Sequence, residues 1–146
     1  MVLELSLKEK SVLVTGGNRG IGLAIALAFA DEGANVAICG RDQAALATAK
    51  SAIEARGVKA HTIAADLFTA AGCEAAIKET ADTFGSFHVL VSNASTNIGG
   101  TLETLTDDQA IERVMGKTLA AMRLSRAALP HLRAAGGGRI LSLIHI

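Results

Sequence analysis

The sequence has 146 residues, half of them apolar, and its 14 lysines and arginines balance its 14 aspartates and glutamates. A chain without net charge has no field that would draw it to nucleic acid or to an anionic membrane, so we expect neither as a partner. The apolar runs are too short to cross a membrane, and the N-terminus lacks the pattern of a signal peptide. We therefore expect one cytoplasmic domain over residues 1–146.

The first predicted elements enclose a glycine-rich segment. Residues 11–15 form an apolar run typical of a buried strand, and residues 21–32 form a helix with almost no polar face. Between them lie Gly16, Gly20 and, just inside the helix, Gly22. The glycines therefore occupy a turn that leads from a buried strand into a buried helix.

Further strands and helices alternate along the chain. The patterns predict strands over 35–39, 58–64 and 87–92, and helices over 42–56 and 69–84. Residues 93–100 are rich in Asn, Ser, Thr and Gly, which is typical of a loop.

A long helix is predicted next, over residues 107–135. Thr106 and Gln109 are spaced for a capping box at its start, and Pro130 lies in its last turns, where a proline bends or ends a helix. Helical spacing selects one apolar stripe as the buried face: Ile111, Val114, Met115, Thr118, Leu119, Met122, Ser125, Leu129 and Leu132. The lysines and arginines of this helix are expected on its solvated face. A fifth strand is predicted over 139–146.

Strict alternation of strands and helices predicts an α/β fold, a doubly wound parallel sheet with right-handed crossovers and helices on both faces. We expect a Rossmann-like, three-layer α/β/α domain with strand order 3-2-1-4-5, incomplete after the fifth strand.

The glycine turn is suited to a phosphate. The first N–H groups of a helix have no intrahelical partners and carry the positive end of the helix dipole. Gly16 can supply the tight turn, Gly20 the close approach of backbone to a ligand, and Gly22 the close packing of helix on strand. A structural loop without a ligand is the alternative.

The spacing of Thr15, Gly16, Gly20 and Gly22 resembles the cofactor-binding turn of the short-chain dehydrogenase/reductase family. The resemblance extends from about residue 7 to the end of the chain. It implies that the backbone at Asn18, Arg19 and Ile21 lies along the phosphates and ribose of a nicotinamide dinucleotide.

The same resemblance assigns two further pairs of residues. It implies that Asp66 hydrogen-bonds the adenine amino group, with the backbone of Leu67 at the ring, and that Asn93 and Ala94 border the cofactor. Ser95 departs from the glycine that usually follows. The alternatives are a turn-forming role for Asp66 and a loop-stabilising role for Asn93.

Position 40, at the end of the second strand, bears on the choice of cofactor. A carboxylate there would accept hydrogen bonds from the adenosine ribose and repel a 2′-phosphate. This chain has Gly40 followed by Arg41, whose guanidinium can pair with a phosphate, and Arg19 can add a second cation. We therefore expect NADP(H) in preference to NAD(H), the alternative being a solvated Arg41 partly neutralised by Asp42.

The catalytic residues of the resembling family are not found here. The family uses a tyrosine as general acid/base, with a lysine four residues later that lowers its pKa, and this chain contains no tyrosine. Thr118 stands where the family has a catalytic Asn and His145 where it has a Ser, and Ser142 lies at an odd offset from that position. We assign no catalytic residue.

The remaining cysteines and histidines suggest no site. Cys39 and Cys73 are expected to be reduced and buried, and His61, His88 and His131 to be structural, with no metal.

The resemblance implies a parent oxidoreductase that transfers hydride to or from a small carbonyl or alcohol substrate, and a homo-oligomer formed through helix 107–135. Two hypotheses stay open: an N-terminal part of such a reductase, cut or frame-shifted near Leu141, or a short protein that is a non-catalytic dinucleotide-binding or interaction module. A methyl-donor-binding transferase is disfavoured by Arg41 and by the spacing of the glycine turn.

Overall fold

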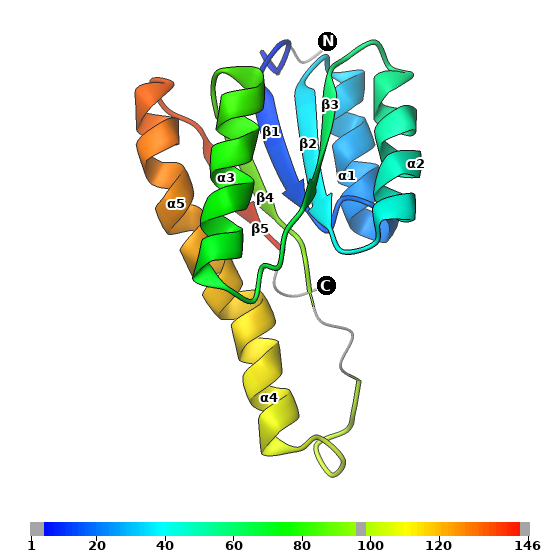
Figure 1. The fold of residues 1–146 in the computed structure, drawn as a ribbon, viewed down its shortest axis with the longest axis vertical. Helices are drawn as coiled ribbons and strands as arrows, with labels where there is room; N and C mark the ends of the chain where they lie inside the picture. Colours follow the sequence, from blue (N-terminus) through cyan, green and yellow to red (C-terminus); the bar gives the residue numbers. More distant parts are fainter. Residues whose placement is uncertain (1–4, 96–98, 144–146) are drawn as a thin grey trace.

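The computed structural model describes residues 5–95 and 99–143. These residues form one parallel five-stranded sheet in the order β3-β2-β1-β4-β5, as the alternation of elements predicts (Figure 1). The strands are β1 (Ser11–Thr15), β2 (Asn35–Gly40), β3 (Ala60–Ala64), β4 (Val89–Ser92) and β5 (Arg139–Ser142). Part of the predicted last strand, residues 144–146, lies outside the described residues.

Helices cover both faces of the sheet and complete the three predicted layers. They are α1 (Gly20–Asp31), α2 (Gln43–Glu54), α3 (Ala70–Phe84), α4 (Asp107–Val114) and α5 (Ala120–Ala134). Side chains alternate across a strand, so Val12 and Val14 pack with α1 and α2 on one face, while Leu13 packs with α3 and α5 on the other. The three central strands, β1, β2 and β4, are buried on both sides, as parallel strands usually are.

Local side-chain signals define where the helices begin. Asp42 Oδ1 accepts a hydrogen bond from Ala45 N at 3.0 Å, and Thr69 Oγ1 accepts one from Gly72 N at 2.9 Å. The capping box predicted from Thr106 and Gln109 is present, and both of its hydrogen bonds form. These caps satisfy N–H groups that would otherwise lack partners, and they explain why the helix starts were predictable.

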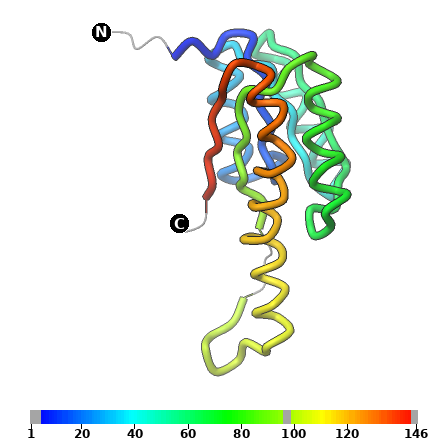
Figure 2. Tube along the Cα trace, turned by 90° about the vertical axis from the view of Figure 1, so that its left-hand side faces the viewer, coloured from blue at the N-terminus to red at the C-terminus, as the bar shows by residue number. Residues whose placement is uncertain are grey.

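The long helix is interrupted at its middle. A π-helical turn, η1 (Met115–Leu119), joins α4 to α5, and the helix then continues past Pro130 to Ala134. Its α4 half and the loop before it project from the body of the domain (Figures 1 and 2). Pro130 therefore does not end the helix.

The predicted buried face of this helix is wrong at most of its positions, although Leu132 is buried as predicted. Ile111, Val114, Met122 and Leu129 are 60%, 56%, 45% and 40% exposed. The residues that pack against the sheet and α3 are Ala120, Leu124, Ala128 and Leu132, and only Leu132 of these was in the predicted stripe. The alanines at 120 and 128 let the backbones of α3 and α5 approach closely, a packing requirement that hydrophobic periodicity does not detect.

The edge strand β5 is exposed to solvent. Ile140 and Leu141 of the edge strand β5 are 41% and 44% exposed. None of the helices in the described ranges is both long enough and apolar enough to span a membrane.

The corrected face of α5 can be tested by enlarging one alanine on each side. Ala128 is fully buried in the contact between α3 and α5, whereas Ala134 is exposed. We expect A128L to lower the free energy of unfolding by about 1–3 kcal/mol, because the added atoms have no space. A134L should change it by less than about 0.5 kcal/mol. Urea denaturation followed by circular dichroism measures both, and equal values would contradict the assigned face.

Candidate functional site

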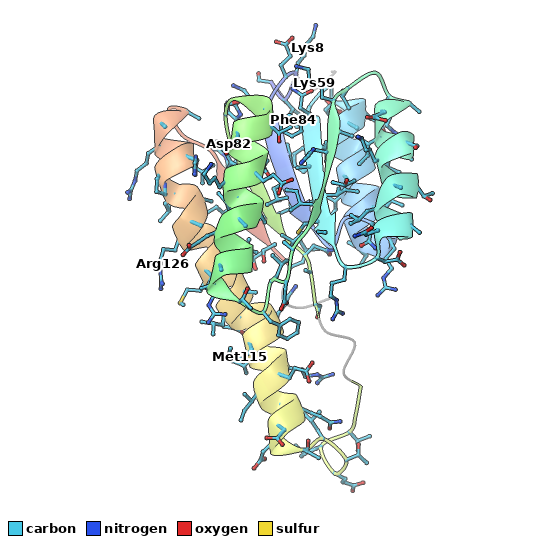
Figure 3. All side chains as sticks on the ribbon, viewed as in Figure 1. Lys8, Lys59, Asp82, Phe84, Met115 and Arg126 are labelled. Atoms are coloured by element: carbon cyan, nitrogen blue, oxygen red, sulfur yellow. The ribbon has the colours of Figure 1, made fainter. Side chains whose placement is uncertain are left out.

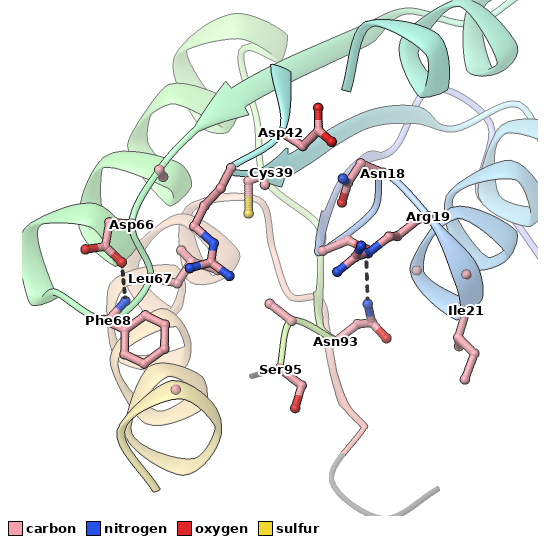
Figure 4. A pocket seen from close by; sticks show the side chains of 18 residues that line it. Asn18, Arg19, Ile21, Cys39, Asp42, Asp66, Leu67, Phe68, Asn93 and Ser95 are labelled. Carbon is pink, nitrogen blue, oxygen red and sulfur yellow. Dashed lines mark hydrogen bonds between the residues drawn. The ribbon is translucent and has the colours of Figure 1, made fainter. Parts of the chain in front are cut away.

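A pocket of about 450 Å³ lies at the carboxyl ends of the strands, where doubly wound sheets bind their ligands (Figure 4). Its lining includes every residue predicted to contact a cofactor except Thr15: Gly16, Asn18, Arg19, Gly20, Ile21, Gly22, Arg41, Asp66, Leu67, Asn93 and Ala94. The folded chain thus brings together residues from four separate loops. Cys39, Gly40, Phe68, Ser95 and Gly116 also line it.

The glycine turn forms one wall of the pocket. Gly16 and Gly20 have φ values of 64° and 54°, in the left-handed region that favours glycine. A Cβ at Gly20 would meet no atom within 4 Å, so the backbone there faces open space. A Cβ at Gly22 would collide with the carbonyl of Gly16 and with the side chain of Asn93, so Gly22 permits close packing of the helix on the turn itself.

The start of α1 is free to meet an anion. Its N-cap residue, Arg19, makes no side-chain capping hydrogen bond, and the first turn contains no acidic residue. The first N–H groups of α1 therefore have neither a side-chain cap nor a carboxylate competing for them within the described chain. This is the geometry in which a helix N-terminus binds phosphate.

Thr15 lies beneath the pocket and connects two of its loops. Its fully buried hydroxyl donates to Val91 O at 3.3 Å and accepts from the backbone N–H groups of Asn93 and Ala94 at 2.9 and 3.0 Å. The Asn93 side-chain amide in turn donates to Thr15 O at 3.0 Å and to Gly16 O at 3.3 Å. Asn93 therefore ties the loop after β4 to the glycine turn.

The end of β2 has no carboxylate. Gly40 occupies the position at which one would stand, and a Cβ there would lie 3.1 Å from Asn18 Oδ1. The Asn18 side chain thus fills the space beside Gly40. Arg41 follows at the rim and is exposed, while the neighbouring Asp42 carboxylate caps α2.

The loop after β3 is held by a turn at Asp66. Asp66 Oδ1 accepts a hydrogen bond from Phe68 N at 3.0 Å, and Asp66 O accepts one from the Thr69 hydroxyl at 3.0 Å. Asp66 therefore forms the turn that we considered as the alternative to adenine binding. It also lines the pocket, so the two roles are compatible.

Two cations of the long helix were assigned wrongly to a solvated face. Lys117 is half-buried, and its ammonium donates to Asn93 O at 3.2 Å and to Ala94 O at 3.3 Å. Arg123 Nη1 donates to Phe68 O at 2.8 Å. Burial lowers the pKa of Lys117 below the usual lysine value. The partners of Lys117 are backbone carbonyls of a distant loop, so the sequence offered no signal for this contact.

The cysteines and histidines have structural environments. Cys39 and Cys73 are free and buried, and burial raises the pKa of Cys39 to about 12. His88 Nδ1 accepts a hydrogen bond from Ser11 N at 3.1 Å, and His61 Nε2 lies 2.7 Å from Glu79 Oε1. Among the described residues, no group of three or more His, Cys, Asp or Glu side chains is placed to hold a metal.

The positions aligned with catalytic residues supply no acid or base in the described part. Thr118 lies in η1 with an exposed side chain, and Ser142 is exposed on β5. His145 lies outside the described residues.

Comparison with known proteins gives consistent matches. The model of the short chain dehydrogenase family matches residues 10–144. The ketoacyl reductase HetN of Nostoc sp. is 37% identical over 140 residues, which are 94% of this chain and 48% of that protein.

Solved structures of other proteins are also similar to this chain. L-sorbose reductase from Gluconobacter frateurii, complexed with NADPH and L-sorbose, is 34% identical with a TM-score of 0.88, over 94% of this chain and 53% of its own. A short chain dehydrogenase from Burkholderia cenocepacia, in complex with NADP, is 36% identical with a TM-score of 0.81, over 86% of this chain and 51% of its own.

This chain spans about half the length of the relatives that it matches. The family model nonetheless covers nearly all of the residues present here. The protein therefore belongs to the short-chain dehydrogenase family.

Proposed function

We propose that this chain binds NADP(H) in preference to NAD(H), as the cofactor-binding part of an oxidoreductase that interconverts a carbonyl and an alcohol. The observation that carries the proposal is the end of β2, where Gly40 and Arg41 replace a carboxylate with a cation beside the pocket. The complexes of two similar proteins with NADP and NADPH support a nicotinamide dinucleotide as ligand, and the preference for NADP(H) rests on Arg41.

The residues present fit such a dinucleotide. The open backbone at Gly20 and the uncapped start of α1 would receive the pyrophosphate. Arg41, with Arg19 from the glycine turn, would pair with the 2′-phosphate. Asp66 and Leu67 would border the adenine, and Asn93 and Ala94 a ribose. When bound, the nicotinamide ring gives or takes the hydride, while this chain binds and orients the ring.

The absence of any tyrosine favours binding without turnover by these residues alone. A phenol assisted by a neighbouring cation is the acid that the family uses, and no described side chain in the pocket replaces it. We therefore propose that the residues needed for proton transfer are not among those present here. A non-catalytic dinucleotide-binding module is the second candidate function.

The cysteines bear on the compartment of the protein. Cys39 and Cys73 are both free thiols, which fits a reducing compartment, and we propose the cytoplasm. We propose a small-molecule carbonyl or alcohol as substrate of the whole reductase.

We also propose a homodimer formed through the long helix. The exposed apolar stripe of Ile111, Val114, Met122 and Leu129 would be covered by a second copy. Charge supports an antiparallel pairing, because Asp107, Asp108 and Glu112 lie in the N-terminal half of the helix, and Arg126 and Arg133 are exposed in its C-terminal half. Arg126 lies on the outer side of α5, away from the sheet (Figure 3).

Cofactor preference is tested by titrating the chain with NADPH and NADH. We expect tighter binding of NADPH, and a loss of about tenfold in NADPH affinity in R41Q, because a charge-assisted hydrogen bond is removed. NADH affinity should stay the same in R41Q. R56Q is the matched control, since Arg56 pairs with Asp31 away from the pocket. Tighter binding of NADH by the unmodified chain would contradict the proposal.

Dimerisation is tested by sedimentation velocity. We expect the unmodified chain to dimerise and M122E to be monomeric, because the substitution places a charge in the middle of the apolar stripe. A47E, on the exposed side of α2, serves as control and should leave the dimer intact. A monomeric unmodified chain, or a dimer that M122E leaves unchanged, would refute this interface.

A further inference from the structure

The backbone of Asn93 and Ala94 is held from two opposite sides. Both N–H groups donate to the Thr15 hydroxyl, which belongs to the strand before the glycine turn. Both carbonyl oxygens accept from one ammonium, that of Lys117 on the long helix. Every backbone polar group of this two-residue segment therefore has a partner, and the partners come from distant parts of the chain.

Lys117 acts from behind this segment. Its side chain is half-buried in η1, and it is not one of the residues that line the pocket. The ammonium has two donors engaged with carbonyls, at 3.2 and 3.3 Å, in a place where burial already disfavours its charge. A charged side chain kept there has its desolvation offset by these hydrogen bonds.

Arg123 makes the corresponding contact with the loop after β3. Its guanidinium donates to Phe68 O at 2.8 Å, one residue beyond Leu67 in the pocket lining. Phe68 N is already bonded to the Asp66 carboxylate, so the Arg123 contact fixes the other end of the same residue. The long helix thus contacts two of the loops that line the pocket.

We propose that Lys117 and Arg123 are positioning residues for the dinucleotide: they fasten the loops at Asn93–Ala94 and at Asp66–Phe68 to the long helix and so hold the pocket in its binding geometry. This rests on the proposed function, because it assumes that the pocket receives a nicotinamide dinucleotide. Neither side chain contacts the ligand itself. Each acts through the loop backbone that it holds. Without these contacts the backbone would have to become ordered when the ligand binds, and that cost would weaken binding.

The experiment compares variants that remove or retain the cation. K117M keeps the length of the side chain but loses its charge and its donors, and K117R retains both. K78M is the matched control, because Lys78 is exposed and pairs with Asp82 on α3, outside the pocket lining. NADPH fluorescence titration gives the dissociation constant of each variant, and thermal denaturation reports whether each is folded.

We expect K117M to bind NADPH about tenfold more weakly than the unmodified chain, the loss expected for hydrogen bonds from a charged donor. The dissociation constants of K117R and K78M should stay within about threefold of that of the unmodified chain. K117R keeps a charge and at least two donors, and Lys78 contacts neither loop. R123M should weaken binding in the same direction, and R123K should restore part of it. Equal affinity of K117M and the unmodified chain would overturn the proposal.

A second readout does not depend on the ligand. Amide hydrogen exchange of Asn93 and Ala94 in the ligand-free chain should accelerate in K117M and return to its original rate in K117R. If the unmodified chain does not bind NADPH, the proposed function fails, while the exchange rates still decide whether Lys117 holds the loop. Unchanged exchange in K117M would refute the positioning role by itself.

Discussion

The buried hydroxyl of Thr15 is the interaction on which the site depends. It stands at the end of the central strand and serves three backbone groups of the neighbouring strand and loop: Val91 O, Asn93 N and Ala94 N. Only a hydroxyl can both donate and accept in this way, and a valine of the same shape would leave two N–H groups without partners. The Thr15 hydroxyl and the Asn93 amide together therefore hold the loop after β4 against the glycine turn.

The glycines follow from the same arrangement. Because Asn93 reaches across to the carbonyls of Thr15 and Gly16, its amide occupies the space into which a side chain at position 22 would project. Gly20 has the opposite reason, since no protein atom lies near its missing side chain. One glycine is thus required by contacts inside the protein, and the other leaves room for something outside it. Gly20 also has a φ of 54°, a backbone conformation that itself favours glycine.

The starts of several helices could be predicted because capping signals are local in the sequence. The site could be predicted because its residues follow the ends of the parallel strands. Asp42, Thr69 and Thr106 cap the helices that they precede, because a capping bond involves residues three positions apart. Most of the buried face of the long helix was predicted wrongly, since Ala120 and Ala128 are buried by close contact with other elements rather than by their own hydrophobicity. Lys117 was missed for the same reason: its partners are backbone carbonyls 23 and 24 residues away, which no spacing rule connects.

The long helix presents two different faces. Its inner face, with Ala120, Leu124, Ala128 and Leu132, packs on the sheet and α3, and from its flank Lys117 and Arg123 donate hydrogen bonds to the loops of the pocket. Its outer face carries the apolar stripe from Ile111 to Leu129. Because α4, η1 and α5 follow one another without a loop, a partner bound to the outer face would contact the same helical segment whose side chains bond the pocket loops. Association and dinucleotide binding should therefore favour each other, and by thermodynamic linkage each should do so to the same extent.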